Sequence, residues 1–130
     1  MKKRGDPDKD NKFYYSWKQF EDDCVVLAVK ITSHPLYKPT KNMYGVPRGG
    51  VPIAVRLSKM INRPLVMQPD KNSIVVDDIV DSGGVRNMFK DNFFVALHTK
   101  PWAIHEANIS VRETVAWIVY PWEILDFDRR

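Results

Sequence analysis

The sequence has 130 residues, a single cysteine and a formal net charge of +4. This length predicts one domain that buries its own apolar core, and the lone Cys24 excludes an intrachain disulfide. The small charge excess argues against a nucleic-acid polymer as partner, and the lack of a leader or a long apolar run predicts a cytoplasmic protein without a membrane partner.

Residues 1–12 carry mostly charged side chains with Gly and Pro, so we expect a flexible N-terminal arm followed by one domain over residues 13–130. Ser16 and Gln19 form a capping box, which indicates the start of an amphipathic helix of roughly four turns. Its apolar residues recur at helical spacing and are Trp17, Phe20, Cys24, Leu27, Ala28 and Ile31.

A strand, a glycine loop and a second helix follow in that order. Asn42 to Val46 is predicted to be a short strand, and it continues into the loop Pro47-Arg48-Gly49-Gly50. Pro52 suits the first turn of a helix. The apolar face of that helix is formed by Ile53, Ala54, Leu57, Met60 and Ile61.

The second half of the chain repeats this order. Short strands are predicted at 64–67 and at Ser73–Val76, and the latter ends in the acid pair Asp77-Asp78. The remaining predicted elements are a helix at 85–89, an apolar strand at 93–97, a last strand at 114–119 and an aromatic turn at 120–123. The alternation of strands and helices predicts an α/β fold with a Rossmann-like, mostly parallel sheet flanked by helices. Such folds bind ligands at the carboxyl ends of their strands.

The acid pair and the glycine turn after it are the strongest functional pattern in the chain. Carboxylates at a strand end can accept hydrogen bonds from sugar hydroxyls or hold hydrated Mg²⁺, which fits Asp77 and Asp78. Gly83 and Gly84 allow backbone amides to approach an anion. The plain alternative is that the acids cap a turn that the glycines bend.

This run resembles the phosphoribosyl-pyrophosphate motif of the type I phosphoribosyltransferases. The resemblance implies that Asp77 and Asp78 bind the ribose hydroxyls and Mg²⁺ and that Asp81 lies near the purine N7. Val85 stands where the family usually has threonine. The 5′-phosphate would be held by Asp81, Ser82, Gly83, Gly84 and Val85.

The earlier glycine loop resembles the pyrophosphate loop of the same family. Pro47, Arg48, Gly49 and Gly50 would bind pyrophosphate, with Arg48 as the cation. The resemblance also implies a cis peptide bond between Pro47 and Arg48. Taken alone, this segment would be an ordinary loop.

Two further segments, His98–Pro101 and Ala116–Glu123, resemble the xanthine-guanine branch of the family. There Lys100 would contact the purine 6-oxo group, Trp117 would stack on the base, and the Ile118 carbonyl would meet the exocyclic group. The alternative is that the tryptophans are core residues and Lys100 is a surface cation.

These features together predict a purine phosphoribosyltransferase that transfers 5-phosphoribosyl from phosphoribosyl pyrophosphate to a 6-oxopurine, with Mg²⁺ as cofactor and with Asp81 and Arg48 as catalytic residues. Only Gln68–Asn72 stands where most relatives have a long hood, so a fold with little or no hood is expected. The alternative is a non-catalytic regulator that binds phosphoribosyl pyrophosphate or a nucleotide. An adenine or pyrimidine transferase is disfavoured by Lys100 and Trp117.

The family resemblance also implies a homodimer or a higher homo-oligomer. The aromatic segments Phe13–Trp17 and Pro121–Phe127 are candidate contact surfaces. His34, His98 and His105 are not spaced as metal ligands, and Cys24 lies on a predicted helix face. Zinc and cysteine-nucleophile chemistry are therefore not expected.

Overall fold

The computed structural model describes residues 11–123. Its centre is a four-stranded sheet in the order β2-β3-β4-β5, in which every neighbouring pair is parallel. The strands are β2 (Asn42–Gly45), β3 (Ser73–Val80), β4 (Phe93–Thr99) and β5 (Ile109–Glu113). The predicted α/β class with a mostly parallel sheet is confirmed.

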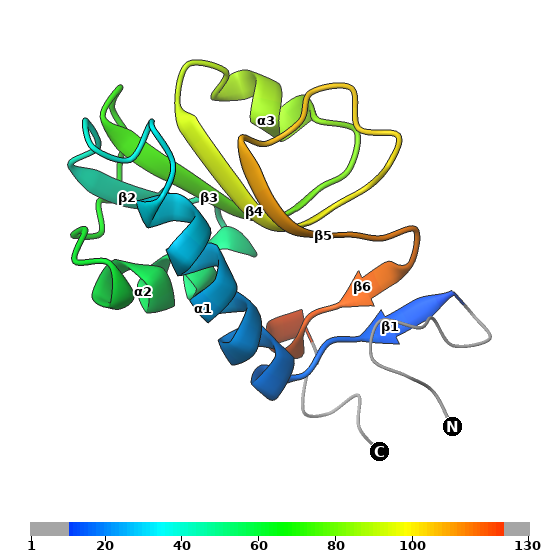
Figure 1. Ribbon diagram of the computed structural model, residues 1–130. Coiled ribbons are helices and arrows are strands. Elements are labelled where there is room, and N and C mark those ends of the chain that lie inside the picture. Colours follow the sequence, from blue (N-terminus) through cyan, green and yellow to red (C-terminus); the bar gives the residue numbers. More distant parts are fainter. Residues whose placement is uncertain (1–10, 124–130) are drawn as a thin grey trace.

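Helices cover both faces of this sheet. Figure 1 shows α1 (Trp17–Thr32) and α2 (Gly50–Met60) on one face and the short α3 (Gly84–Met88) on the other. The predicted capping box starts α1, because the Ser16 hydroxyl accepts a hydrogen bond from the Gln19 amide at 3.0 Å and the Gln19 side chain accepts one from the Ser16 amide at 2.8 Å.

The alternation of side chains along β3 and β4 divides the core into two parts. Ile74, Val76, Val95 and Leu97 pack toward α1 and α2 in the larger cluster. On the other face, a smaller cluster consists of Val75, Val80, Phe94 and Ala96. Because successive residues of a strand point to opposite faces, both central strands are apolar on both sides, as expected for a parallel sheet.

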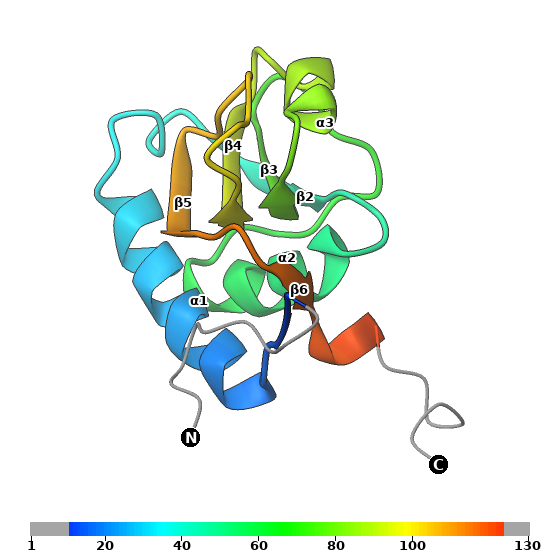
Figure 2. The same cartoon turned by 90° about the vertical axis from the view of Figure 1, so that its right-hand side faces the viewer.

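A second, two-stranded sheet lies beyond the carboxyl ends of β3, β4 and β5 (Figure 2). In it β1 (Lys12–Tyr14) pairs in parallel with β6 (Trp117–Val119), and the short helix η1 (Pro121–Glu123) follows. The sequence analysis did not predict β1. Its first residue, Lys12, belongs to the segment expected as a flexible arm, whose residues 1–10 lie outside the described part of the chain.

The bounds predicted for the last strand, 114–119, were wrong. The structure has β5 at Ile109–Glu113 and β6 at Trp117–Val119, separated by a turn in which the Thr114 hydroxyl accepts a hydrogen bond from the Ala116 amide at 3.0 Å. The predicted strand at 64–67 is reduced to one bridge between Met43 and Leu65.

The strand predicted at 73–76 is longer than expected. β3 continues to Val80, so the acid pair lies inside the strand and not after it. Asp77 pairs in register with Ala96 of β4, which fixes the direction of its side chain. No helix within residues 11–123 is long and apolar enough to cross a membrane.

Candidate active site

The acid pair lies near the carboxyl end of β3, and both carboxyl groups have lost much of their contact with water. Asp77 is only 8 % exposed. Burial, followed by the charge of Asp78, raises the pKa of Asp77 well above its ordinary value. Burial also raises the pKa of Asp78, although the Ile79 amide donates a hydrogen bond to its carboxylate at 2.8 Å. A buried, repelling acid pair of this kind favours a cation or a set of hydroxyl donors as its partner.

The glycine loop after β2 packs directly against this pair. A Cβ atom on Gly49 would lie 2.0 Å from the Asp78 carboxylate, and one on Gly50 would lie 2.2 Å from the Val76 carbonyl oxygen. Only glycine permits such an approach. The peptide bond between Pro47 and Arg48 is cis, as the family resemblance implied. Arg48 then lines an open cleft together with Asp78 and Trp122.

A small hollow lies beside the acid pair, over the turn between β3 and α3. It is lined by Asp77 and by the whole segment Asp81–Val85. Gly83 has a φ of +100°, which strongly favours glycine at this position. The structure therefore brings the predicted phosphate-binding residues together around one hollow.

Two buried side chains hold the backbone of the acid pair, and the sequence analysis assigned neither to the site. The Tyr120 hydroxyl donates a hydrogen bond to the Asp78 carbonyl oxygen at 3.0 Å and lies 2.9 Å from His98 Nδ1. Because the Tyr120 hydroxyl uses its only proton in the hydrogen bond to the Asp78 carbonyl oxygen, it can only accept from His98. The protonated Nδ1 of His98 therefore donates the hydrogen bond to the Tyr120 oxygen. Burial lowers the pKa of His98 to about 4, so the ring is neutral at pH 7.

Of the predicted base residues, Lys100 directly follows β4, and Trp117 and Ile118 belong to β6. Lys100 is 9 % exposed, and its ammonium group donates a hydrogen bond to the Ala116 carbonyl oxygen, so it is not a surface cation. Trp117 is 68 % exposed and therefore not a core residue, whereas Ile118 is buried. Trp122, the other candidate core aromatic, is half-buried and stacks on Tyr120 with 5.0 Å between the ring centroids.

Comparison with solved structures supports the family resemblance. No family model matches the chain. The chain is 28% identical to a purine phosphoribosyltransferase from Pyrococcus horikoshii Ot3, with a TM-score of 0.76, over 88% of this chain and 96% of the other. The chain thus has the type I phosphoribosyltransferase fold, and its similarity to this enzyme supports the family that the sequence motifs resemble.

Two other structures show the same fold at lower identity. The xanthine-guanine-hypoxanthine phosphoribosyltransferase of Helicobacter pylori is 22% identical, with a TM-score of 0.75, over 87% of this chain and 94% of that one. A hypothetical protein from Neisseria gonorrhoeae with bound ppGpp is 20% identical, with a TM-score of 0.69, over 90% of this chain and 92% of that one.

The family's Mg²⁺ fits the donor set found here. Asp77 and Asp78 supply carboxylate oxygens, which Mg²⁺ prefers, and because burial raises the pKa of both acids, a bound cation would favour their charged form. Among the described residues, no group of three or more His, Cys, Asp or Glu side chains could hold a metal ion. Mg²⁺ is commonly bound by one or two carboxylates together with substrate phosphates.

Trp102 is a third side chain near this site that the sequence analysis did not assign. Its indole Nε1 donates a hydrogen bond to the Asp81 carboxylate at 2.7 Å, and its ring centroid lies 5.2 Å from the Lys100 ammonium. No sequence signal marked it, because it follows Pro101 in a segment without periodicity. Only the folded chain brings it beside residue 81.

Proposed function

We propose that this phosphoribosyltransferase transfers the 5-phosphoribosyl group of phosphoribosyl pyrophosphate to a 6-oxopurine and uses Mg²⁺. The observation that carries the proposal is the packing of the Gly49-Gly50 loop against Asp78, next to the hollow lined by Asp81–Val85. One edge of the sheet thus offers a place for each part of the donor: pyrophosphate at Arg48, ribose at the acid pair and 5′-phosphate at the hollow.

In the proposed reaction, a purine nitrogen forms a bond to the anomeric carbon while the bond from that carbon to pyrophosphate breaks. The electron pair of the broken bond leaves with pyrophosphate, whose charge Arg48 stabilises. Asp81 accepts the proton from N7 of the base. Asp77 and Asp78 hold the ribose and would hold Mg²⁺, which offsets the charge of the leaving group when it is bound.

The choice of base rests on Lys100 and β6. An ammonium group donates hydrogen bonds and accepts none, so Lys100 favours a 6-oxo group over the 6-amino group of adenine. One of its three donors is used by the Ala116 carbonyl, which leaves two for a ligand. Trp117 follows directly and offers an exposed ring for stacking.

The test is nucleotide formation from phosphoribosyl pyrophosphate and Mg²⁺ with guanine, xanthine, hypoxanthine and adenine in parallel reactions. We expect nucleotides from the 6-oxopurines and little from adenine. Asp81→Asn should abolish turnover, whereas Asp91→Asn, an exposed acid at the other end of the sheet, should not. Equal turnover of adenine would contradict the proposed base specificity.

A non-catalytic regulator is the second candidate. The fold supports it, because a protein of the same fold from Neisseria gonorrhoeae binds ppGpp. The short segment 66–72 also supports it, since a long hood that could exclude water from the reacting centre is lacking in these residues. Tight binding of phosphoribosyl pyrophosphate or a guanine nucleotide without product from any base would favour this candidate.

The proposal includes a homodimer or higher homo-oligomer in the cytoplasm. In the candidate contact segment Phe13–Trp17, Tyr14 is 55 % and Trp17 is 58 % exposed. The second segment, Pro121–Phe127, is described only to Glu123, so its last four residues lie outside the described part. Light scattering at several protein concentrations would give the oligomeric state.

A further inference from the structure

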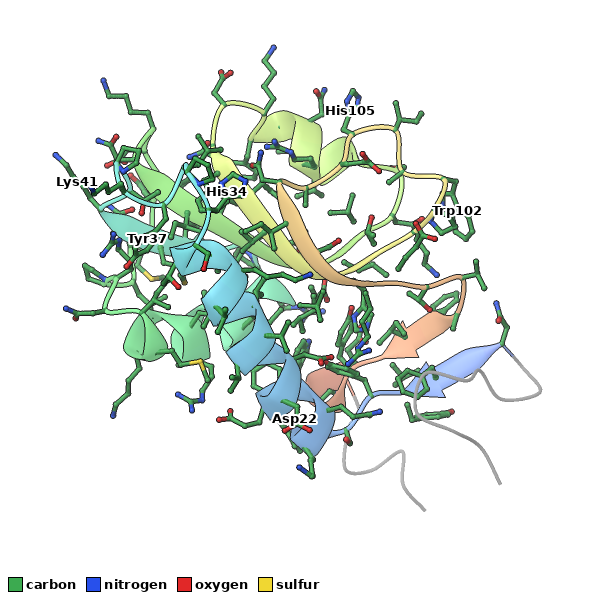
Figure 3. All side chains as sticks on the ribbon, viewed as in Figure 1. Asp22, His34, Tyr37, Lys41, Trp102 and His105 are labelled. Carbon is green, nitrogen blue, oxygen red and sulfur yellow. The ribbon has the colours of Figure 1, made fainter. Side chains whose placement is uncertain are left out.

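The loop between β4 and β5 covers the phosphate-binding turn, and Trp102 projects from it (Figure 3). The two side chains that Trp102 contacts, Asp81 and Lys100, directly follow two different strands, β3 and β4. Both belong to the proposed base site, one at the purine N7 and the other at the 6-oxo group. A single ring therefore touches both groups that would recognise the base.

The backbone that carries Trp102 is fixed to the phosphate-binding turn. The Ile104 amide donates a hydrogen bond to the Ser82 carbonyl oxygen at 2.9 Å. A Cβ atom on Gly83 would lie 2.6 Å from the His105 amide nitrogen, so the two segments are in close contact. The Arg86 side chain also donates to the Glu106 carbonyl oxygen at 2.9 Å. These three contacts hold the loop on the carboxyl side of residue 102, and on its amino side the Lys100 amide donates a hydrogen bond to the Val80 carbonyl oxygen at 2.9 Å.

Asp81 has an exposed side chain at the start of a turn, so its carboxylate would rotate freely without a partner. The indole Nε1 of Trp102 donates its hydrogen bond to Oδ1 of Asp81, so this bond does not occupy Oδ2 of the same carboxylate. A carboxylate held by one oxygen can present the other in a fixed direction, and such orientation of a reacting group accelerates a reaction.

We propose that Trp102 is a positioning residue, which holds the Asp81 carboxylate toward the purine N7 and covers Lys100 from water. This inference rests on the proposed function, because that function gives Asp81 its role. It goes further by assigning to the β4–β5 loop part of the shielding that a long hood would supply. Trp102 acts through Asp81 and Lys100 and does not itself react.

The contact can be tested without any turnover, by the indole N–H signals in a ¹H–¹⁵N NMR spectrum. Trp102→Phe identifies the Trp102 signal by its loss. In Asp81→Asn this signal should move to the position of an indole with a neutral acceptor, while the Trp17 signal stays in place. An unmoved Trp102 signal would overturn the proposal, because the indole then does not hold Asp81.

Steady-state kinetics test the positioning role. Trp102→Phe keeps the ring and removes the donor, and we expect kcat to fall by roughly tenfold with the KM for phosphoribosyl pyrophosphate unchanged. Trp102→His, which restores a ring N–H, should recover part of the loss. The matched control is Ile104→Ala, which changes an 80 % exposed side chain of the same loop and should leave both parameters unchanged.

Three outcomes would overturn the proposal: a kcat of Trp102→Phe within twofold of the wild type, an equal loss in Ile104→Ala, or tighter base binding in Trp102→Phe without loss of kcat. The last outcome would mean that the indole competes with the base. If the wild type itself makes no nucleotide, the proposed function fails, whereas the NMR shift still decides whether Trp102 positions Asp81.

Discussion

The ribose-phosphate half of the site and its base half are built in different ways. The first consists of two continuous segments, residues 44–50 and 77–85, whose shape depends on close backbone approaches that glycine permits. The second is assembled from side chains on β6 and on the loop between β4 and β5. Short segments with backbone roles can be identified in a sequence, whereas side-chain contacts across the fold cannot.

The largest effect is expected in the ribose-phosphate half, for Gly50→Ala. The new Cβ would lie 2.2 Å from the Val76 carbonyl oxygen, a backbone atom that cannot move aside cheaply. We expect the free energy of unfolding to fall by about 3 kcal/mol, as for an overpacked core site, measured by urea denaturation.

The control for this prediction is Gly84→Ala. There the nearest atom to the new Cβ would be the Ser82 hydroxyl oxygen at 3.7 Å, and the residue lies in a helix. The free energy of unfolding should stay the same or rise, because alanine favours helix more than glycine does. Equal losses in both variants would contradict the close packing of the Gly49-Gly50 loop on β3.

The second prediction concerns the link between the two halves. Tyr120→Phe leaves the Asp78 carbonyl and His98 Nδ1 without their shared hydroxyl partner. We expect the free energy of unfolding to fall by about 2 kcal/mol, because buried polar groups lose their hydrogen bonds. Tyr37→Phe, which loses a hydroxyl bond to the Ile61 carbonyl oxygen far from the site, is the matched control for activity. Only Tyr120→Phe should also lower turnover.

The third prediction concerns pH. The pKa of Asp77 is higher in the folded protein than its ordinary value near 4. The folded state therefore binds more protons than the unfolded state above pH 4, and stability from this group falls as the pH rises. Asp77→Asn removes this penalty, so its free energy of unfolding should exceed that of the wild type by about 1 kcal/mol or more at pH 8.

The advantage of Asp77→Asn should disappear as the pH approaches 4. His98 acts in the opposite direction, since burial lowers its pKa to about 4 and stability is lost as the pH falls below about 6.5. This contribution is present in both proteins and cancels in their difference. A difference that does not change with pH, in parallel thermal and urea unfolding series, would show that Asp77 is not a repelled buried acid.

The smallest effect on stability is expected for Trp117→Ala. The ring is 68 % exposed, so the free energy of unfolding should change by less than about 0.5 kcal/mol. Loss of stacking should nevertheless raise the KM for the base about tenfold or less. A large loss of stability with unchanged KM would instead assign Trp117 to the packing between β1 and β6.

The sequence predicted the parallel sheet because strands alternate with helical segments along the chain, and it predicted the two loops because a glycine loop follows β2 and an acid pair with a glycine turn marks the end of β3. It missed β5 because Ile109 is the only buried residue of this strand, so the strand has little apolar pattern. It missed β1 because the partner strand lies about a hundred residues away and local preferences do not contain that pairing.

The same distinction explains the site. Asp77, Asp78 and the Gly49-Gly50 loop could be assigned from their order along the chain. The roles of Tyr120 and Trp102 depend on contacts with residues 42 and 21 positions away, respectively. Such contacts follow from tertiary packing, and an isolated tyrosine or tryptophan in a sequence does not reveal them.

The most direct test of the account measures pyrophosphate and purine nucleotide together, in one reaction with phosphoribosyl pyrophosphate, Mg²⁺ and guanine. We predict that the two products form in equal amounts and that Asp77→Asn combined with Asp78→Asn abolishes both. Pyrophosphate without nucleotide, or nucleotide formation that survives the double substitution, would contradict the claim that this acid pair holds the donor for transfer to a base.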